Sequence, residues 1–185
     1  MRTRFACAAS AVALVAGLGA ADAGTAYREF GDRGRAQDVR RTIDVVMRDN
    51  AYEPQRIEVR AGETVRFRVQ NRGEFMHEFN LGTPAMHADH RREMQRMVDA
   101  GHMTATGLAP AGGSPAGGAH GAHGAAGHGG GHGAMAHDDP NSILLEPGKS
   151  GELIWKFTRA TKLEFACNVP GHYESGMVGQ VRFAR

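Results

Sequence analysis

Residues 163–183 read LEFACNVPGHYESGMVGQVRF, in which two runs of alternating apolar residues flank a polar loop. Alternation with a period of two predicts a strand on each side of the loop, because successive side chains of a strand point to opposite faces. The loop carries a C-x4-H-x4-M pattern formed by Cys167, His172 and Met177. Pro170-Gly171 predicts a turn that brings His172 back beside the sulfur. The stretch therefore predicts two strands joined by a loop of soft and borderline metal donors.

The period-two pattern recurs along the chain, and turn residues such as Ala61-Gly62 and Asn71-Arg72-Gly73 close its segments. We expect strands over residues 42–47, 56–59, 64–69, 78–81, 142–145, 152–157, 162–166 and 178–183. About eight short strands of this kind indicate an all-β protein, a Greek-key β-sandwich with antiparallel strands.

Length, charge and the N-terminal segment limit the class of protein. A chain of 185 residues with a formal net charge of +2 favours one domain and excludes nucleic acid as a default partner. Arg2 and Arg4 precede an uncharged segment over residues 5–21, and Ala21-Asp22-Ala23 resembles a cleavage site, so residues 1–23 are predicted to be a signal peptide. We expect a periplasmic protein without a membrane anchor after cleavage. Cys7 would leave with the signal, and Cys167 would be the single cysteine of the mature chain.

The rest of the chain divides by composition. Residues 24–41 lack an apolar period and are predicted to be a flexible tail, and residues 42–185 form the domain. A Met/His/Gly-rich insert over residues 83–140 interrupts it, with a helix predicted over residues 86–99 and capped near Thr83-Pro84. Residues 101–137 contain 13 Gly, 10 Ala and 6 His among 37 residues and no Asp, Glu, Lys or Arg, which predicts a disordered tract.

His77, at the start of an earlier predicted strand, is a candidate fourth donor beside Cys167, His172 and Met177. Two imidazoles, one thiolate and a weak thioether are the ligands of an electron-transfer copper site, whereas a structural zinc site favours more cysteines and no thioether. Two alternatives remain at this point. Each residue alone could be ordinary structure, with Cys167 a buried free thiol, and Cys167 with a histidine could be a catalytic nucleophile, although no oxyanion loop is evident.

With these motifs, the chain resembles the cupredoxins, type 1 copper β-sandwiches related to plastocyanin and azurin. The match covers about residues 42–82 and 140–185, and the export signal and the insert make the chain most similar to the periplasmic copper-tolerance cupredoxins of proteobacteria. The resemblance implies one type 1 copper with His77, Cys167 and His172 as in-plane ligands and Met177 as the axial ligand. In two respects the chain departs from the family: Glu78 follows the first histidine where many members have Asn, and the Cys-to-His spacing is longer than in plastocyanin.

The insert is a candidate second metal region that binds additional copper weakly. On a helix, His87, His90, Met94 and Met97 share one face. The alternative is that the methionines pack on the sandwich while the histidines face water. The full candidate set is Met86, His87, His90, Met94, Met97, His102, His120, His123, His128, His132 and His137.

These features predict an exported copper-binding protein that acts in copper tolerance by binding and redox-handling copper, and that is not an enzyme. The alternatives are a dedicated one-electron carrier to a respiratory oxidase or reductase, and a cuprous oxidase, for which no second set of closely spaced ligands is evident in the folded part. The expected partners are copper ions and a redox partner protein, with His172 as the port for electrons.

Overall fold

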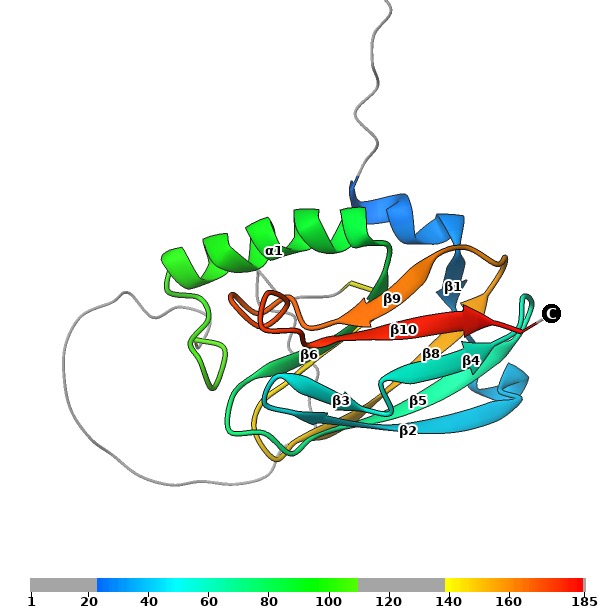
Figure 1. The fold of residues 1–185 in the computed structure, drawn as a ribbon, viewed down its shortest axis with the longest axis horizontal. Coiled ribbons are helices and arrows are strands. Elements are labelled where there is room, and N and C mark those ends of the chain that lie inside the picture. The colour runs from blue at the N-terminus through cyan, green and yellow to red at the C-terminus, as the bar shows by residue number, and fades with distance from the viewer. Residues whose placement is uncertain (1–22, 110–138, 185) are drawn as a thin grey trace, which may run out of the picture.

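The structure is a computed structural model that describes residues 23–109 and 139–184 (Figure 1). Within these residues it contains ten strands, one α-helix and two 3-10 helices. In chain order they are η1 (Ala23–Glu29), β1 (Gly31–Arg33), η2 (Ala36–Asp38), β2 (Arg41–Arg48), β3 (Ala51–Glu53), β4 (Arg56–Val59), β5 (Thr64–Asn71), β6 (His77–Gly82), α1 (Pro84–Asp99), β7 (Ser142–Leu145), β8 (Ser150–Phe157), β9 (Leu163–Ala166) and β10 (Val178–Phe183).

The strands form two five-stranded sheets, which confirms the predicted β-sandwich. The first sheet has the order β1-β8-β5-β2-β3 and the second the order β4-β10-β9-β6-β7. Both sheets are mixed, because β2 pairs with β5 and β4 pairs with β10 in parallel. The expectation of antiparallel strands is therefore wrong for these two pairs. Alternation of apolar residues reports which face of a strand is buried, but not the direction of its neighbour.

The core lies between the sheets and is rich in aromatic rings. Phe67 of the first sheet packs on Phe79 of the second, with ring centroids 5.2 Å apart, and Phe79 lies 5.3 Å from Phe165. Helix α1 covers the outside of the second sheet along β6 and β9 (Figure 1). All six residues of β6 are consequently buried, including those that face away from the core.

The helix begins where the sequence predicts. Thr83 is the N-cap residue, and its side-chain oxygen accepts a hydrogen bond from the backbone N–H of Met86. Pro84 occupies the first turn, where its missing N–H has no cost. Because β6 ends at Gly82, a single residue separates the strand from the helix. This short connection fixes the helix against the strand that precedes it.

The prediction of a flexible tail over residues 24–41 is wrong. β1 pairs with β8 at the edge of the first sheet, and Phe30 is fully buried, with its ring 5.5 Å from that of Trp155. At Gly31 a Cβ atom would lie 2.2 Å from the indole nitrogen of Trp155, so only glycine lets the strand approach the ring. Two aromatic residues, Tyr27 and Phe30, in a polar segment give no periodic signal.

The prediction of a disordered tract over residues 101–137 is wrong for its first nine residues. Residues 101–109 fold against the sandwich: Met103 is 2% exposed, and the backbone N–H of Met76 donates to the carbonyl of Ala105 at 2.7 Å. The remainder of the predicted disordered tract, residues 110–137, and residues 1–22 of the predicted signal peptide lie outside the described residues. No helix among the described residues has the length and apolar character needed to cross a membrane.

Candidate metal centre

Strand pairing brings the donors together at one end of the second sheet. His77 is the first residue of β6, and Cys167 directly follows β9. These strands are antiparallel neighbours, so the beginning of β6 lies beside the end of β9. The loop after Cys167 then returns His172 to the sulfur. Gly171 adopts a φ of 86°, which glycine reaches without strain, and the N–H of His172 donates to the carbonyl of Val169.

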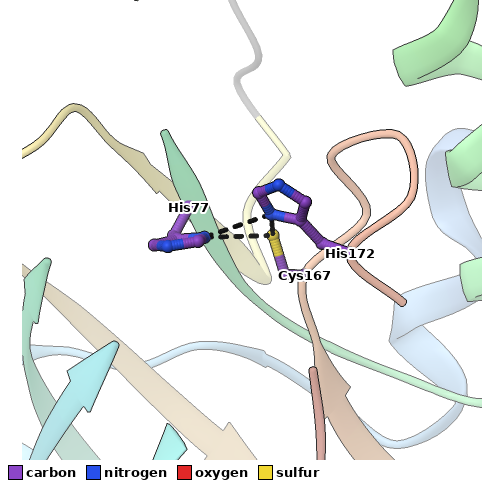
Figure 2. A group of neighbouring side chains, drawn as sticks. All are labelled: His77, Cys167 and His172. Carbon is purple, nitrogen blue, oxygen red and sulfur yellow. Dashed lines mark hydrogen bonds between the residues drawn. The ribbon is translucent and has the colours of Figure 1, made fainter. Parts of the chain in front are cut away.

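The three donor atoms converge on one point, as Figure 2 shows. The Sγ atom of Cys167 lies 3.3 Å from Nδ1 of His172 and 3.9 Å from Nδ1 of His77, and the two Nδ1 atoms are 3.1 Å apart. Metal–ligand bonds of about 2.0–2.3 Å place the donors of a shared ion about 3.3–3.7 Å apart. One ion therefore fits this cluster with small adjustments. Among the described residues, these three form the one group of at least three histidine, cysteine or carboxylate side chains that is compact enough to hold a metal ion.

Asp49 fixes the orientation of the His77 ring. Its Oδ1 atom lies 2.9 Å from Nε2 of His77, the nitrogen that faces away from the sulfur. If Nε2–H donates to this carboxylate, Nδ1 is left with the lone pair that a metal requires. Gly73 leaves room for the pair, because a Cβ atom there would lie 2.3 Å from Oδ1 of Asp49 and 2.6 Å from Nε2 of His77.

The protonation of the donors follows from their burial. Cys167 is fully buried, and this burial raises the pKa of its thiol to about 12, so the metal-free side chain is neutral. Burial lowers the pKa of His77, although Asp49 opposes the shift. The half-buried His172 has a lowered pKa because of burial and of the neighbouring His77. Both imidazoles are thus available as neutral ligands, and a metal ion must displace the thiol proton.

The backbone of Met177 is hydrogen-bonded to two of the donor residues, Cys167 and His172. Its carbonyl accepts a hydrogen bond from the N–H of Cys167 at 3.2 Å, and its own N–H donates to the carbonyl of His172 at 3.0 Å. The side chain is fully buried. Its role as axial ligand stays a prediction.

Glu78 connects the donor cluster to helix α1. Its backbone N–H donates to Sγ of Cys167 at 3.4 Å, which supplies a hydrogen bond to the sulfur. Its fully buried carboxylate lies 2.9 Å from Nε2 of His90 and accepts from Nδ2 of Asn168 at 2.8 Å. The sequence marked Glu78 only as a departure from the usual asparagine. The sequence shows a glutamate on a predicted strand next to a predicted helix with histidines, but it does not show that this glutamate is buried.

The helix histidines lie in this network and not in solvent. His87 is 1% and His90 9% exposed, so the alternative in which both face water is wrong. Nδ1 of His87 lies 3.2 Å from Nδ2 of Asn168. Burial acts to lower the pKa of His90, but the carboxylates of Glu78, Asp139 and Glu93 outweigh it and raise this pKa to about 9.

The remaining candidate donors of the insert occupy different environments. Met94 is fully buried, Met86 and Met97 are partly buried against the core, and His102 is exposed. His120, His123, His128, His132 and His137 lie outside the described residues. Metal binding by the insert stays a prediction.

Sequence reasoning missed Asp49 as a partner of the site. Asp49 follows the strand predicted over residues 42–47 and carries no motif, and its contact with His77 bridges 28 positions of the chain. Phe75 was also missed. Its ring is 42% exposed and lies 6.3 Å from that of His172, so an apolar side chain borders the accessible ligand.

Comparison with known proteins agrees with this geometry. A sequence profile of the cupredoxin-like domain matches residues 9–91, which include His77 and end before Cys167. The fold is similar to that of auracyanin B, with a TM-score of 0.55 and 18% identity over 84% of this chain and 96% of that one. It is also similar to an auracyanin of Roseiflexus castenholzii, with a TM-score of 0.50 and 19% identity over 78% and 97%. The fold and the donor cluster define a cupredoxin-like β-sandwich.

Two relatives narrow this class. The chain is 55% identical over 152 residues to the copper-resistant cuproprotein CopI of Pseudomonas aeruginosa, covering 82% of this chain and 81% of that protein. It is 40% identical over 167 residues to the protein of the same name from Rubrivivax gelatinosus, covering 90% and 78%. The chain therefore belongs to the family of copper-resistant cuproproteins CopI, which confirms the resemblance found in its sequence.

Proposed function

We propose that this chain is an exported, periplasmic protein that contributes to copper tolerance by binding one copper ion and cycling it between Cu(II) and Cu(I). The copper ligands are His77, Cys167 and His172, with Met177 as a weak axial ligand. The observation that carries the proposal is the convergence of one thiol and two imidazoles, with donor atoms 3.1–3.9 Å apart, in a family of copper-resistant cuproproteins.

The donor chemistry supports copper over other metals. Thiolate and thioether suit Cu(I), imidazole suits both oxidation states, and two histidines with one cysteine form the trigonal set of electron-transfer copper sites. Copper in such a site supplies one-electron exchange. The protein's residues do the rest: Asp49 orients His77, the N–H of Glu78 donates to the sulfur, and the sheet holds both strands in place.

The arrangement favours electron exchange through His172. His172 is half-buried at the edge of the cluster, and the exposed ring of Phe75 lies next to it. We infer that electrons enter and leave through His172, towards a redox partner protein. We assign no catalytic reaction to the chain.

Replacing the sulfur tests the proposal. The wild-type protein loaded with Cu(II) should show an intense visible charge-transfer band with one copper per chain at this site, and Cys167→Ser should abolish the band. His102→Gln, which alters an exposed histidine of the insert, should keep it. A band that survives Cys167→Ser, or a wild-type protein that shows none, would contradict the proposed site.

A further inference from the structure

Helix α1 contacts the residue that directly follows each of the three donors. Glu78 follows His77, and its carboxylate Oε1 lies 2.9 Å from Nε2 of His90. Asn168 follows Cys167, and its side-chain amide lies 3.2 Å from Nδ1 of His87. The donor segments of β6 and of the loop after β9 are thus both held by the same helix.

The third contact completes the set. Tyr173 follows His172, and the guanidinium of Arg91 lies over its ring, 4.0 Å from the centroid. Arg91 also forms an ion pair with the next residue, Glu174, at 3.0 Å. The phenol of Tyr173 in turn donates to the carboxylate of Glu164 on β9. The loop that carries His172 is therefore fixed from the helix on one side and from the sheet on the other.

These three helix residues form one continuous surface. His87, His90 and Arg91 occupy positions i, i+3 and i+4, which lie on the same face of a helix. The helix is itself held close to the strand, since a Cβ atom at Gly82 would lie 3.1 Å from Nε2 of His87. A rigid surface with three contact points can set the relative positions of three chain segments.

These contacts form between groups of the protein itself and do not require a metal ion. Glu78 and His90 are both buried, and the carboxylate of Glu78 lies 2.9 Å from Nε2 of His90. A satisfied polar contact is stronger in the protein interior than in water, because the local dielectric constant is low. The guanidinium of Arg91 is in addition attracted to the face of the Tyr173 ring by a cation–π interaction.

We propose that the face of α1 formed by His87, His90 and Arg91 is a positioning surface that holds the three donors at metal-binding separation before the metal arrives. The proposal rests on the proposed function only for the identity of the donors. It makes the helical part of the insert an integral part of the site. A helix that merely covered the sheet would contribute to stability without altering the donors.

Two adjacent arginines provide a matched test. Arg91→Ala removes the contacts with Tyr173 and Glu174, whereas Arg92→Ala removes an exposed side chain that contacts Ala88 and Asp89 on its own helix. Loss of an outer partner of a metal ligand typically weakens metal binding 10–100-fold. We expect Arg91→Ala to shift the charge-transfer band and to weaken copper binding roughly tenfold, and Arg92→Ala to match the wild type. His90→Gln should produce a shift of the same kind.

A stability control separates positioning from general loosening. Met94 lies on the same helix and is fully buried, but its side chain belongs to the hydrophobic core. Met94→Ala should lower the melting temperature and leave the band unchanged. A band shift in Met94→Ala equal to that in Arg91→Ala would show that helix stability alone governs the spectrum, and would overturn the proposal.

A measurement without copper distinguishes this proposal from the proposed function. In the folded, metal-free protein, the rate at which iodoacetamide alkylates Cys167 reports how firmly the donor loop is held. Arg91→Ala and His90→Gln should raise that rate above those of wild type and Arg92→Ala. If the wild type lacks a Cys167-dependent band but the rates still differ in this way, the proposed function fails and the positioning surface stands. The positioning surface would be overturned if both variants kept the alkylation rate of the wild type and, where the band is present, also kept the band unchanged.

Discussion

The outer face of the first sheet exposes charged side chains to solvent, whereas the outer face of β6 in the second sheet is covered by helix α1. On the first sheet, Arg68 pairs with Asp44 at 2.7 Å, and both side chains are more than half exposed. On β6, Glu78 is fully buried, and its carboxylate binds His90 and Asn168. The same alternating pattern of residues thus produces a solvated surface in one sheet and an internal polar layer in the other.

This difference explains why the metal donors lie at the second sheet. A buried polar layer must satisfy its hydrogen bonds within the protein, and in doing so it fixes the segments that carry the donors. Surface ion pairs contribute about 0–1 kcal/mol, because solvent screens them. The second sheet therefore holds the segments that carry the metal donors, whereas substitutions on the outer face of the first sheet should have little effect on stability.

The largest effect on stability is expected at Glu78 of the second sheet, and Glu152 of the first sheet serves as the comparison. Glu78→Ala should lower the free energy of unfolding of the metal-free protein by about 3–5 kcal/mol, because it leaves the His90 cation buried without its closest partner. Glu152→Ala removes an exposed partner of Arg66 and should cost about 0–1 kcal/mol. Urea unfolding followed by circular dichroism measures both. Similar losses in the two variants would remove the distinction between the sheets.

The sequence predicted the features that depend on local pattern. Period two located the main strands, and the C-x4-H-x4-M spacing placed Cys167 and His172 in one loop. β1 and β3 were missed because three residues are too few to show a period. The role of Asp49 and the inward orientation of His87 depend on contacts between segments far apart in the chain, which no local pattern encodes.

The polar layer should also make stability depend on pH. The pKa of His90 in the folded protein, about 9, lies above its unfolded value of 6.5, so the folded state binds this proton more tightly. The resulting stabilisation is fully present below pH 6.5, is lost as the pH rises through 9, and amounts to about 3 kcal/mol.

Comparison with His90→Gln isolates this contribution. Between pH 6 and pH 9.5, as set in the buffers, the metal-free wild type should lose about 3 kcal/mol more unfolding free energy than the variant. Other titrating groups, including the thiol of Cys167, are shared by both proteins and cancel in the difference. Parallel pH profiles would show that the charge of His90 adds no stability.

Asp49 is the point where the first sheet reaches the metal site. It directly follows β2, and its carboxylate binds Nε2 of His77, whereas Asp44 lies on the solvated face of the same strand. Hydrogen bonds from His77 and from the backbone of Glu74 and Phe75 outweigh the effect of burial and hold the pKa of Asp49 below its usual range. A carboxylate at this position makes the imidazole a better ligand.

Asp49→Asn should therefore weaken copper binding about 10–100-fold, while Asp44→Asn leaves it unchanged. Competition with a chelator of known copper affinity measures both. Equal affinities in the two variants would mean that the first sheet contributes nothing to the site beyond packing.

The smallest effect on stability is expected from the insert beyond residue 109. A deletion from residue 101 would remove the buried Met103 and the hydrogen bond between Met76 and Ala105, so it would disturb the folded end of the sandwich. A deletion of residues 115–132 avoids these contacts and removes four histidines. Because the entropy of loop closure changes slowly with length, this deletion should alter the free energy of unfolding by about 1 kcal/mol or less.

Copper titration then shows whether the deleted segment binds metal. The deletion variant should keep the charge-transfer band but bind fewer total equivalents of copper, because imidazole is a good ligand for Cu(II). A full-length variant with His120→Gln, His123→Gln, His128→Gln and His132→Gln separates the ligands from the length of the segment, and it should lose the same equivalents. Equal stoichiometry in all three proteins would leave the segment as a connection between α1 and β7. Loss of the band would show that the deleted segment contributes to the metal site at the second sheet.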